Sequence, residues 1–217
     1  MYTLYYSPGA CSLATHIVIE ETGAAYELAL ISTKDQTQTP AWKAVNPKGR
    51  VPALSPVAGR IGGTDNLLTE AGAIMFYLAR THPEAKLLPT EIAAQARCIE
   101  WMSWLTSSVH AQSFGQLWRT PRFTDDESQF PAIRAKGLTN VRDAFGYIEK
   151  LLGDGRDWAV PGGYSIVDAY LTVFFVWGKR LEIDMRRDYP AWARQADKVA
   201  ARPAVQRVLA QEGIAVP

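Results

Sequence analysis

The stretch that decides the fold is residues 2–16, YTLYYSPGACSLATH, at the start of the chain. β-Branched and aromatic residues over 2–6 predict a short strand. Residues 7–9 end it, because proline fixes φ and glycine permits backbone conformations that other residues avoid. From Ser12 onward the apolar spacing becomes that of a helix. Cys11 is therefore predicted to lie where a strand passes into the N-terminus of a helix.

The position of Cys11 favours a functional role over a structural one. Backbone N–H groups and the helix dipole at a helix N-terminus favour an anion, so we expect a lowered pKa for the Cys11 thiol. The same N–H groups can hold a ligand's carboxylate or thiolate. The alternative is a small buried thiol that fills a gap in the core, which is the commoner role of a lone cysteine.

Length and composition predict a globular protein large enough for two structural units. The chain has 217 residues, of which 47% are hydrophobic and 21% charged, and this balance excludes a disordered chain. A formal net charge of +1 predicts no nucleic-acid partner. The two cysteines, Cys11 and Cys98, are too few for a disulfide framework or a structural zinc site, and Cys98 reads as a passive thiol.

Neither export, membrane insertion nor metal binding is predicted. The start of the chain lacks the basic and apolar regions of a secretory signal. The longest apolar run, 169–177, is far shorter than the roughly 20 residues that span a bilayer. We expect no membrane partner and a cytoplasmic location. His16 and His82 have no carboxylate cluster at ligand spacing, so we expect no metal and place both at the surface or at helix caps.

The remaining elements of the first part of the chain follow from turn residues and short apolar runs. They are a strand over 26–31, helical turns over 40–46, a strand headed by Pro52, a hairpin connection over 56–66, a strand at 67–68 and a helix that begins at Thr69-Glu70. Pro52 is a candidate for a cis peptide bond in a tight turn, and a ligand can use the backbone groups of Val51 before it. Glu70 either complements the helix dipole or offers its carboxylate to a charged ligand.

From residue 91 onward the pattern is helical. It predicts long helices from 91 and over 132–152, a capping box at Ser165–Asp168, and shorter helices from near Tyr189 and Pro203. The order of elements predicts a thioredoxin-like α/β domain over residues 1–81, a linker over 82–90 and an all-α domain over 91–217. Ligands of such sheets bind beyond the carboxyl ends of the strands, where Cys11, Val51 and Glu70 are expected to meet.

Four segments resemble the glutathione transferase family, and within it the bacterial beta class. They are Tyr5–Leu13 (YYSPGACSL), Asn46–Leu54 (NPKGRVPAL), Leu68–Glu70 (LTE) before a helix, and Ser165–Ala169 (SIVDA). The resemblance covers nearly the whole chain. It implies glutathione transferase architecture, glutathione as co-substrate, an acceptor pocket contributed by the all-α domain, and a homodimer.

The resemblance also assigns roles to single residues. Cys11 matches a cysteine that contacts the glutathione sulfur and can form a mixed disulfide with it, and His110 matches a histidine that reaches toward the same sulfur. The glutathione-binding residues that it implies are Tyr6, Ser12, Lys34, Val51, Pro52, Glu70, Ala71, Ser103 and Ser107. Of these, Val51 is expected to hold the cysteinyl backbone, Glu70 with Ala71 the γ-glutamyl end, and Lys34 the glycyl carboxylate.

The sequence departs from the family pattern at four places. Ala71 stands where many relatives have serine, Ala111 where a lysine often follows the histidine, and Ser107 where an acidic residue is found. The hairpin over 56–66 is longer than the family pattern. These departures concern glutathione affinity and the subunit interface.

Three functions are compatible with this sequence. The first is conjugation of the glutathione thiolate to small hydrophobic electrophiles in detoxification, with Phe114, Trp118, Tyr170 or Trp177 either lining the acceptor pocket or belonging to the core. The second is a glutathione-dependent thiol–disulfide reductase, restricted to a one-thiol route because Ala14 occupies the second position of a C-x-x-C motif. The third is a non-catalytic ligand-binding protein.

Overall fold

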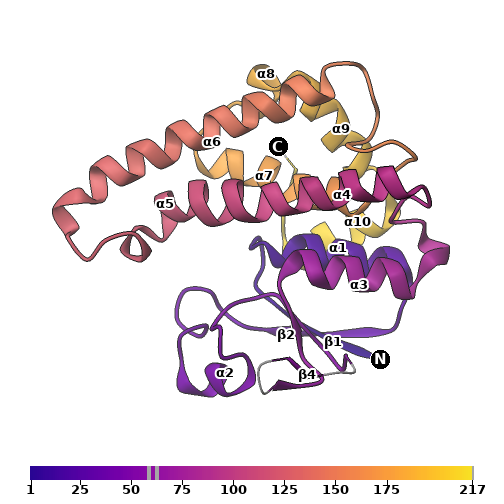
Figure 1. Cartoon of the computed structure of the whole chain (residues 1–217), viewed down its shortest axis with the longest axis horizontal. Coiled ribbons are helices and arrows are strands. Elements are labelled where there is room, and N and C mark those ends of the chain that lie inside the picture. The colour runs from indigo at the N-terminus through magenta and orange to yellow at the C-terminus, as the bar shows by residue number, and fades with distance from the viewer. Residues whose placement is uncertain (58–59, 62–63, 217) are drawn as a thin grey trace.

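A computed structural model describes residues 1–57, 60–61 and 64–216 (Figure 1). The first part of the chain forms β1 (Tyr2–Tyr6), α1 (Ser12–Thr22), β2 (Tyr26–Leu30), α2 (Pro40–Val45), β3 (Ala53–Ser55), β4 (Arg60–Ile61), β5 (Thr64–Asp65), β6 (Leu68–Thr69) and α3 (Ala71–Thr81). The main sheet has the strand order β2-β1-β3-β6, with β1 parallel to β2 and β3 antiparallel to both of its neighbours. This is the predicted thioredoxin-like arrangement.

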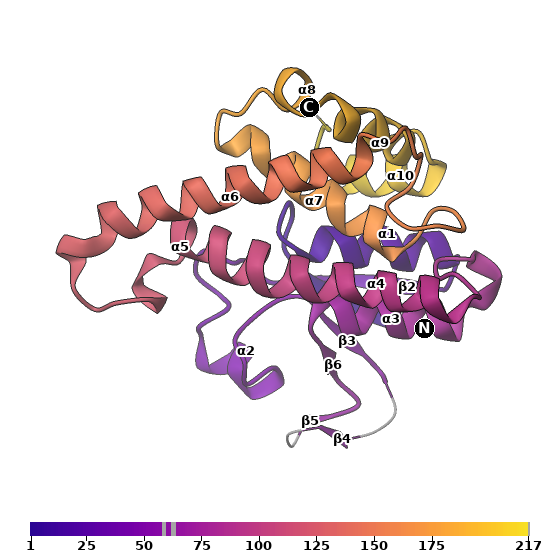
Figure 2. The same cartoon turned by 45° about the horizontal axis from the view of Figure 1, so that its top comes forward.

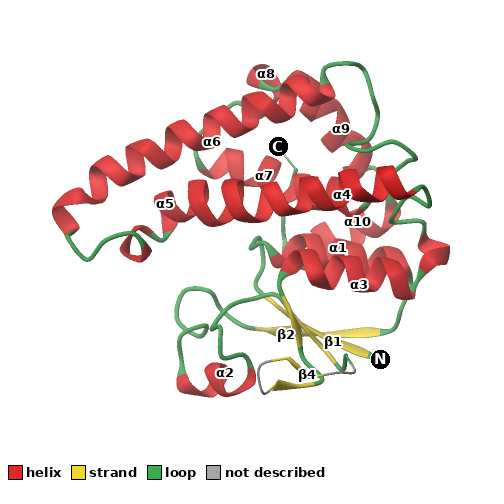
Figure 3. Cartoon of the chain, in the orientation of Figure 1, coloured by secondary structure: helices red, strands yellow, loops and turns green. Residues whose placement is uncertain are grey.

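The second part of the chain is helical, as expected (Figure 3). Its elements are the short turn η1 (Pro83–Ala85), α4 (Ile92–Trp104), the π-helical segment η2 (Leu105–Phe114), α5 (Gly115–Trp118), the short turns η3 (Thr120–Arg122) and η4 (Glu127–Gln129), α6 (Phe130–Leu152), α7 (Ile166–Arg180), α8 (Met185–Asp188), α9 (Pro190–Ala200) and α10 (Pro203–Glu212). The predicted capping box is confirmed at the start of α7, where Ser165 and Asp168 bond each other's backbone N–H groups.

The structure differs from the predicted elements at three places. The helix expected to begin at Thr69-Glu70 begins at Ala71, because Glu70 has φ +73°, which no helical residue adopts. The π-helical segment and α8 were not predicted. Within the predicted hairpin over 56–66, β4 pairs antiparallel with β5, and residues 58–59 and 62–63 lie outside the described residues.

Helices α1 and α3 cover one face of the sheet and separate it from the helical domain (Figures 1 and 2). α1 packs against α3 on its own domain and against α7 and α10 of the helical domain. Because it has neighbours on several sides, α1 is buried along Ser12–Ile19, and α7 is buried along Ile166–Gly178. The two domains therefore share one continuous apolar core.

The turn that carries Cys11 is held by hydrogen bonds from the helical domain to the Gly9 peptide. The Gly9 N–H donates to Oε2 of Glu212 in α10, and the Gly9 carbonyl accepts from Nε1 of Trp177 in α7, both at 2.8 Å. Gly9 has φ +65°, and a Cβ there would lie 2.3 Å from an Arg180 nitrogen. A residue with a Cβ would be strained at this position. We call the two bonds the Gly9 clamp.

His16 extends the Gly9 clamp into the core. Its Nδ1 lies 2.8 Å from Oε1 of Glu212, and its Nε2 lies 3.1 Å from the Tyr26 hydroxyl. The side chains of His16 and Glu212 are both fully buried. The predicted surface or capping position of His16 is therefore wrong: its polar partner is supplied by α10, which the local sequence around residue 16 does not indicate.

Replacing Glu212 is expected to loosen the clamp and destabilise the fold. Glu212→Ala leaves the Gly9 N–H and His16 buried without an acceptor, so we expect a loss of about 3 kcal/mol in the free energy of unfolding. Glu212→Gln, which keeps one acceptor oxygen, is expected to lose less. Urea denaturation followed by tryptophan fluorescence measures both. Glu127→Ala, at an exposed glutamate, is the matched control, and equal losses in Glu212→Ala and Glu127→Ala would refute the clamp's role.

Candidate active site

A cavity of about 330 Å³ lies where the sheet domain meets the helical domain, beyond the carboxyl end of β1. Among the predicted site residues, it is lined by Cys11, Val51, Pro52, Glu70, Ala71 and His110. These residues come from the Cys11 turn, the loop before β3, the start of α3 and the π-helical segment. Segments that are far apart in the sequence thus meet at the edge of the sheet where ligands of α/β domains bind.

The other predicted site residues lie outside this cavity. Lys34 lines an adjoining cavity that it shares with Lys48 and Arg50. The Tyr6 ring packs against His16, with ring centroids 5.7 Å apart. Ser103 and Ser107 are exposed, and the Ser107 hydroxyl donates to the Ser103 carbonyl.

Ser12 stabilises the Cys11 turn from inside the protein. Its fully buried hydroxyl donates to the Ser7 carbonyl and accepts from the Ser7 N–H, both at 3.1 Å. These bonds close the turn that the sequence places between β1 and α1. Ser12 therefore supports the Cys11 turn through Ser7 and does not line the cavity.

Cys11 faces the cavity as a thiol and not as a thiolate. Its Sγ lies 3.4 Å from the Val51 carbonyl oxygen, to which only a protonated sulfur can donate. Burial raises the pKa of the Cys11 thiol to about 12, and the N–H groups of Cys11 and Ser12 oppose that rise only partly. The expected lowering of the Cys11 pKa is therefore wrong, because the loss of solvation outweighs the helix N-terminus.

The loop before β3 presents backbone groups to the cavity. The Val51–Pro52 peptide bond is cis, as predicted. The Ser55–Pro56 bond is also cis, which was not predicted. The Val51 carbonyl points at Cys11, so the loop and the Cys11 turn are in direct contact.

Glu70 stands between the end of β6 and the start of α3, with its carboxylate in an ion pair. Its Oε1 lies 2.7 Å from Nζ of Lys48, which also donates to the Thr69 hydroxyl at 2.9 Å. Both charged side chains are about half exposed, so a charged ligand can compete for either of them. The Ala71 N–H lies in the first turn of α3, where orphan backbone donors attract a carboxylate.

His110 enters the cavity from the π-helical segment. Its Nδ1 lies 3.3 Å from the Tyr170 hydroxyl, and its ring packs against Trp177 with centroids 5.2 Å apart. Burial, reinforced by the positive charges of Arg50 and Arg122, lowers the pKa of His110 to about 4. The imidazole is therefore neutral at pH 7 and acts as a hydrogen-bonding group rather than as a cation.

The opposite wall of the cavity is aromatic. The four residues that the sequence left open between pocket and core all border it: Phe114, Trp118, Tyr170 and Trp177. Phe114, Tyr170 and Trp177 are almost fully buried and belong to the core as well, whereas Trp118 is partly exposed. The Phe114, Trp118 and Trp177 rings pack together, with centroid distances of 4.8 to 5.0 Å. Such a surface suits the face of a small apolar or aromatic ligand.

Sequence reasoning missed the basic residues of this cavity. Lys48, Arg50, Arg119, Arg122 and Arg180 all line it. A signal was present for some of them: Lys48 and Arg50 flank Gly49 in the segment before Pro52, and Arg119 and Arg122 flank the helix break at Pro121.

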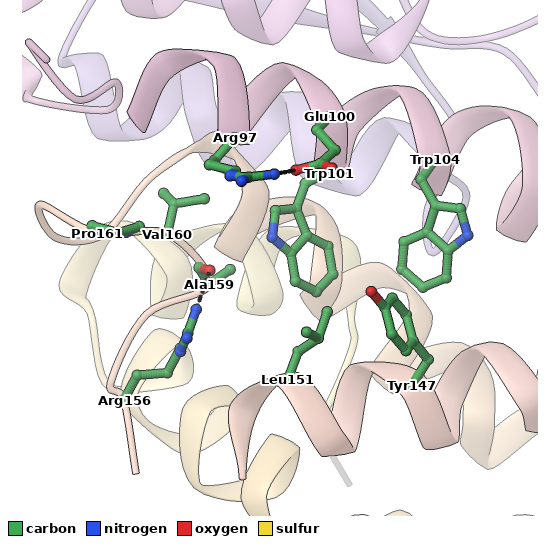
Figure 4. A pocket seen from close by; sticks show the side chains of 10 residues that line it. All are labelled: Arg97, Glu100, Trp101, Trp104, Tyr147, Leu151, Arg156, Ala159, Val160 and Pro161. Carbon is green, nitrogen blue, oxygen red and sulfur yellow. Dashed lines mark hydrogen bonds and ion pairs between the residues drawn. The ribbon is translucent and has the colours of Figure 1, made fainter. Parts of the chain in front are cut away.

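A second cavity, of about 550 Å³, lies between α4 and α6 (Figure 4). It is lined by aromatic side chains, Trp101, Trp104 and Tyr147, and its charged residues include the Arg97–Glu100 ion pair. It contains none of the predicted site residues. Over the part of the chain that the structure describes, no three histidine, cysteine or acidic side chains gather as a metal site would require, and no helix is long and apolar enough to cross a membrane.

Comparison with known proteins identifies the family. The family model for the glutathione S-transferase N-terminal domain matches residues 1–80. Glutathione S-transferase GstA of Escherichia coli O157:H7 is 33% identical over 216 residues, which cover 97% of this chain and 98% of GstA.

Two solved structures are similar over nearly the full length. A glutathione transferase homologue from Sulfitobacter with bound glutathione superposes with a TM-score of 0.87 at 30% identity, covering 99% of both chains. A beta-class glutathione S-transferase of Sphingomonas chungbukensis superposes with a TM-score of 0.80 at 33% identity, covering 98% of this chain and all of that one. From its fold, its cavity and a relative that matches it end to end, we conclude that the chain belongs to the glutathione S-transferase family.

Proposed function

We propose that this protein is a beta-class glutathione S-transferase that conjugates glutathione to small electrophiles with an apolar ring, as in detoxification. The observation that carries the proposal is the two-sided cavity. Cys11, the cis Val51–Pro52 loop and Glu70 form one side, and four aromatic side chains form the other. One side suits a charged peptide and the other a hydrophobic acceptor. Residues 1–81 would then bind glutathione, and residues 91–217 would supply the acceptor pocket.

Each residue of the first side has a distinct task in this proposal. Val51 holds the cysteinyl backbone of glutathione, while Glu70 and the Ala71 N–H receive the γ-glutamyl end. The Cys11 thiol turns its hydrogen from the Val51 carbonyl to the glutathione sulfur. A hydrogen bond to a charged group contributes about 1.5–3 kcal/mol, which favours the glutathione thiolate over the thiol. The neutral His110 offers a further hydrogen bond beside the sulfur.

The reaction needs no covalent bond to the protein. The glutathione sulfur attacks the electrophilic carbon, a C–S bond forms, and the leaving group departs with its bonding electron pair. The thiol proton passes to solvent. Holding both reactants in one cavity supplies much of the acceleration through proximity.

The reductase alternative requires Cys11 to attack a disulfide as a thiolate. Burial holds Cys11 protonated at neutral pH, and Ala14 provides no resolving thiol. These observations favour conjugation. The third function, ligand binding without catalysis, would not require glutathione at all.

Replacing Cys11 distinguishes the three functions. With 1-chloro-2,4-dinitrobenzene as acceptor, we expect Cys11→Ala to lower kcat/KM roughly 10- to 100-fold, the cost of one hydrogen bond to a charged sulfur. Reduction of hydroxyethyl disulfide should vanish in the same variant. Cys98→Ala removes the other thiol, which does not line the cavity, and is the matched control. Glutathione binding without turnover of any electrophile by the wild type would contradict the conjugation proposal.

The pH dependence of alkylation tests the protonation state of the Cys11 thiol. Iodoacetamide reacts with the thiolate, so with a pKa near 12 the rate at Cys11 should rise about tenfold per pH unit from pH 7 to pH 10 without levelling off. A free cysteine levels off above its pKa of about 8.5. Mass spectrometry of the Cys11 peptide measures the rate separately from Cys98. A plateau below pH 8 would show that the thiolate is favoured after all.

We also propose that the protein is a homodimer in a reducing, cytoplasmic environment. The proposed interface is the face of α4 and α6 that contains the cavity of Figure 4. Ile92 on α4 is 77% exposed and Tyr147 on α6 is 52% exposed, an arrangement that a second copy would bury. The free thiols of Cys11 and Cys98 suit a reducing location.

Light scattering after size exclusion tests the dimer. We expect twice the chain mass of 24.0 kDa for the wild type. Tyr147→Glu places a charge on the proposed interface and should shift the mass toward one chain. Leu30→Glu, at an exposed apolar residue of β2, is the control and should remain dimeric. A monomeric wild type at micromolar concentration would contradict this proposal.

A further inference from the structure

The cavity beside Cys11 has a large excess of positive charge. Lys48, Arg50, Arg119, Arg122 and Arg180 line it, and Glu70 is the carboxylate among the described lining residues. Glu70 is already paired with Lys48. Within the described parts of the chain, no ion pair joins any of these four arginines to a carboxylate. Most of this positive charge therefore has no counter-charge in the protein.

The arginines lie close enough for each to destabilise the positive charge of its neighbours. Partial burial, and after it the charges of Arg50 and Arg119, lower the pKa of Arg122. One guanidinium nitrogen of Arg119 donates to the Trp118 carbonyl, which is neutral. All of these basic residues are exposed, so water screens part of their repulsion, and a bound anion relieves what remains.

Glutathione accounts for only part of this charge. As a thiolate, it carries two carboxylates, one ammonium group and the sulfur charge, a net charge of about −2. The five basic side chains and the Glu70 carboxylate give the lining a net charge of +4. Arg119 and Arg122 also come from the helical domain, beside Trp118, while Val51, Glu70 and Ala71, the predicted glutathione contacts that line this cavity, are on the sheet domain. Both arginines also line the adjoining cavity that contains Lys34.

We propose that the acceptor substrate is an aromatic electrophile that carries a carboxylate or a similar anionic group. Its ring packs on Phe114, Trp118 and Trp177, and its anion binds Arg119 and Arg122. This inference rests on the proposed conjugation and names the acceptor class. The planar guanidinium group suits a carboxylate because two N–H donors match two oxygens.

The anionic group takes no part in the bond changes. For an aryl chloride, the glutathione sulfur forms the C–S bond, the C–Cl bond breaks, and chloride leaves with the electron pair. The carboxylate keeps its charge throughout, so the arginines stabilise substrate and transition state alike. Their loss is therefore expected to raise KM more than it lowers kcat.

A pair of acceptors with the same leaving group tests the proposal. We compare 4-chloro-3,5-dinitrobenzoate with the neutral 1-chloro-2,4-dinitrobenzene and divide each kcat/KM by the uncatalysed rate constant. The resulting anionic-to-neutral ratio is expected to exceed 10 at 50 mM salt and to fall at 200 mM salt, because salt screens exposed charges. A ratio near or below 1 would overturn the proposal.

Single substitutions then locate the subsite. Arg119→Gln and Arg122→Gln are each expected to lower the anionic-to-neutral ratio about tenfold, through KM for the benzoate, and Arg122→Lys should recover part of the loss. Arg142→Gln, at an exposed arginine of α6, is the matched control and should leave the ratio unchanged. If the Gln variants instead raise KM for glutathione and leave the ratio unchanged, the arginines serve glutathione and the proposal is wrong.

A binding measurement separates this inference from the proposed conjugation. Unreactive 3,5-dinitrobenzoate and neutral 1,3-dinitrobenzene are titrated into the protein with tryptophan fluorescence as the readout. Tighter binding of the benzoate, weakened about tenfold in Arg122→Gln, would support the anion subsite even if neither chloride were turned over. Equal binding of the two compounds, unaffected by Arg122→Gln, would overturn the subsite even if conjugation were observed.

Discussion

The active-site turn depends on the hydrogen bonds that hold the Gly9 peptide between two helices of the other domain. Glu212 in α10 accepts from its N–H and Trp177 in α7 donates to its carbonyl. Because Cys11 follows two residues later, these bonds fix where its sulfur lies. Trp177 is also part of the aromatic wall. The indole that positions the Cys11 turn therefore also borders the cavity, and both sides of the cavity depend on this contact.

Desolvation sets the protonation states of Cys11 and His110 in this cavity. It keeps Cys11 protonated, against what the isolated motif suggests, and it keeps His110 neutral. A helix N-terminus contributes about 0.3–1 kcal/mol to an anion, which is too little to restore the charge of a buried sulfur. The cavity thus has neutral hydrogen-bonding groups at Cys11 and His110, and its fixed charges are on Glu70, Lys48 and the arginines.

The sequence was sufficient to predict features that depend on residues adjacent in the chain. The strand, the break and the helix over 2–22, the cis Val51–Pro52 bond and the capping box at Ser165 each follow from a few adjacent side chains. Contacts between residues far apart in the sequence could not be predicted in this way. The burial of His16 depends on Glu212, and the shared cavity of Arg50 and Arg122 depends on how the domains pack. The prediction of a lowered pKa for Cys11 was wrong for the same reason, because the burial of a side chain depends on the whole fold.

The contact between Gly9 and Glu212 also has a consequence for the order of assembly. It joins residues 203 positions apart, so a large loop must close before the bond can form. During synthesis the sheet domain emerges first, while α10 follows every other helix described here. The thiol turn therefore receives its final geometry only when α10 docks against α1. A nascent chain can fold its sheet early, but it acquires a competent site only when its two ends meet.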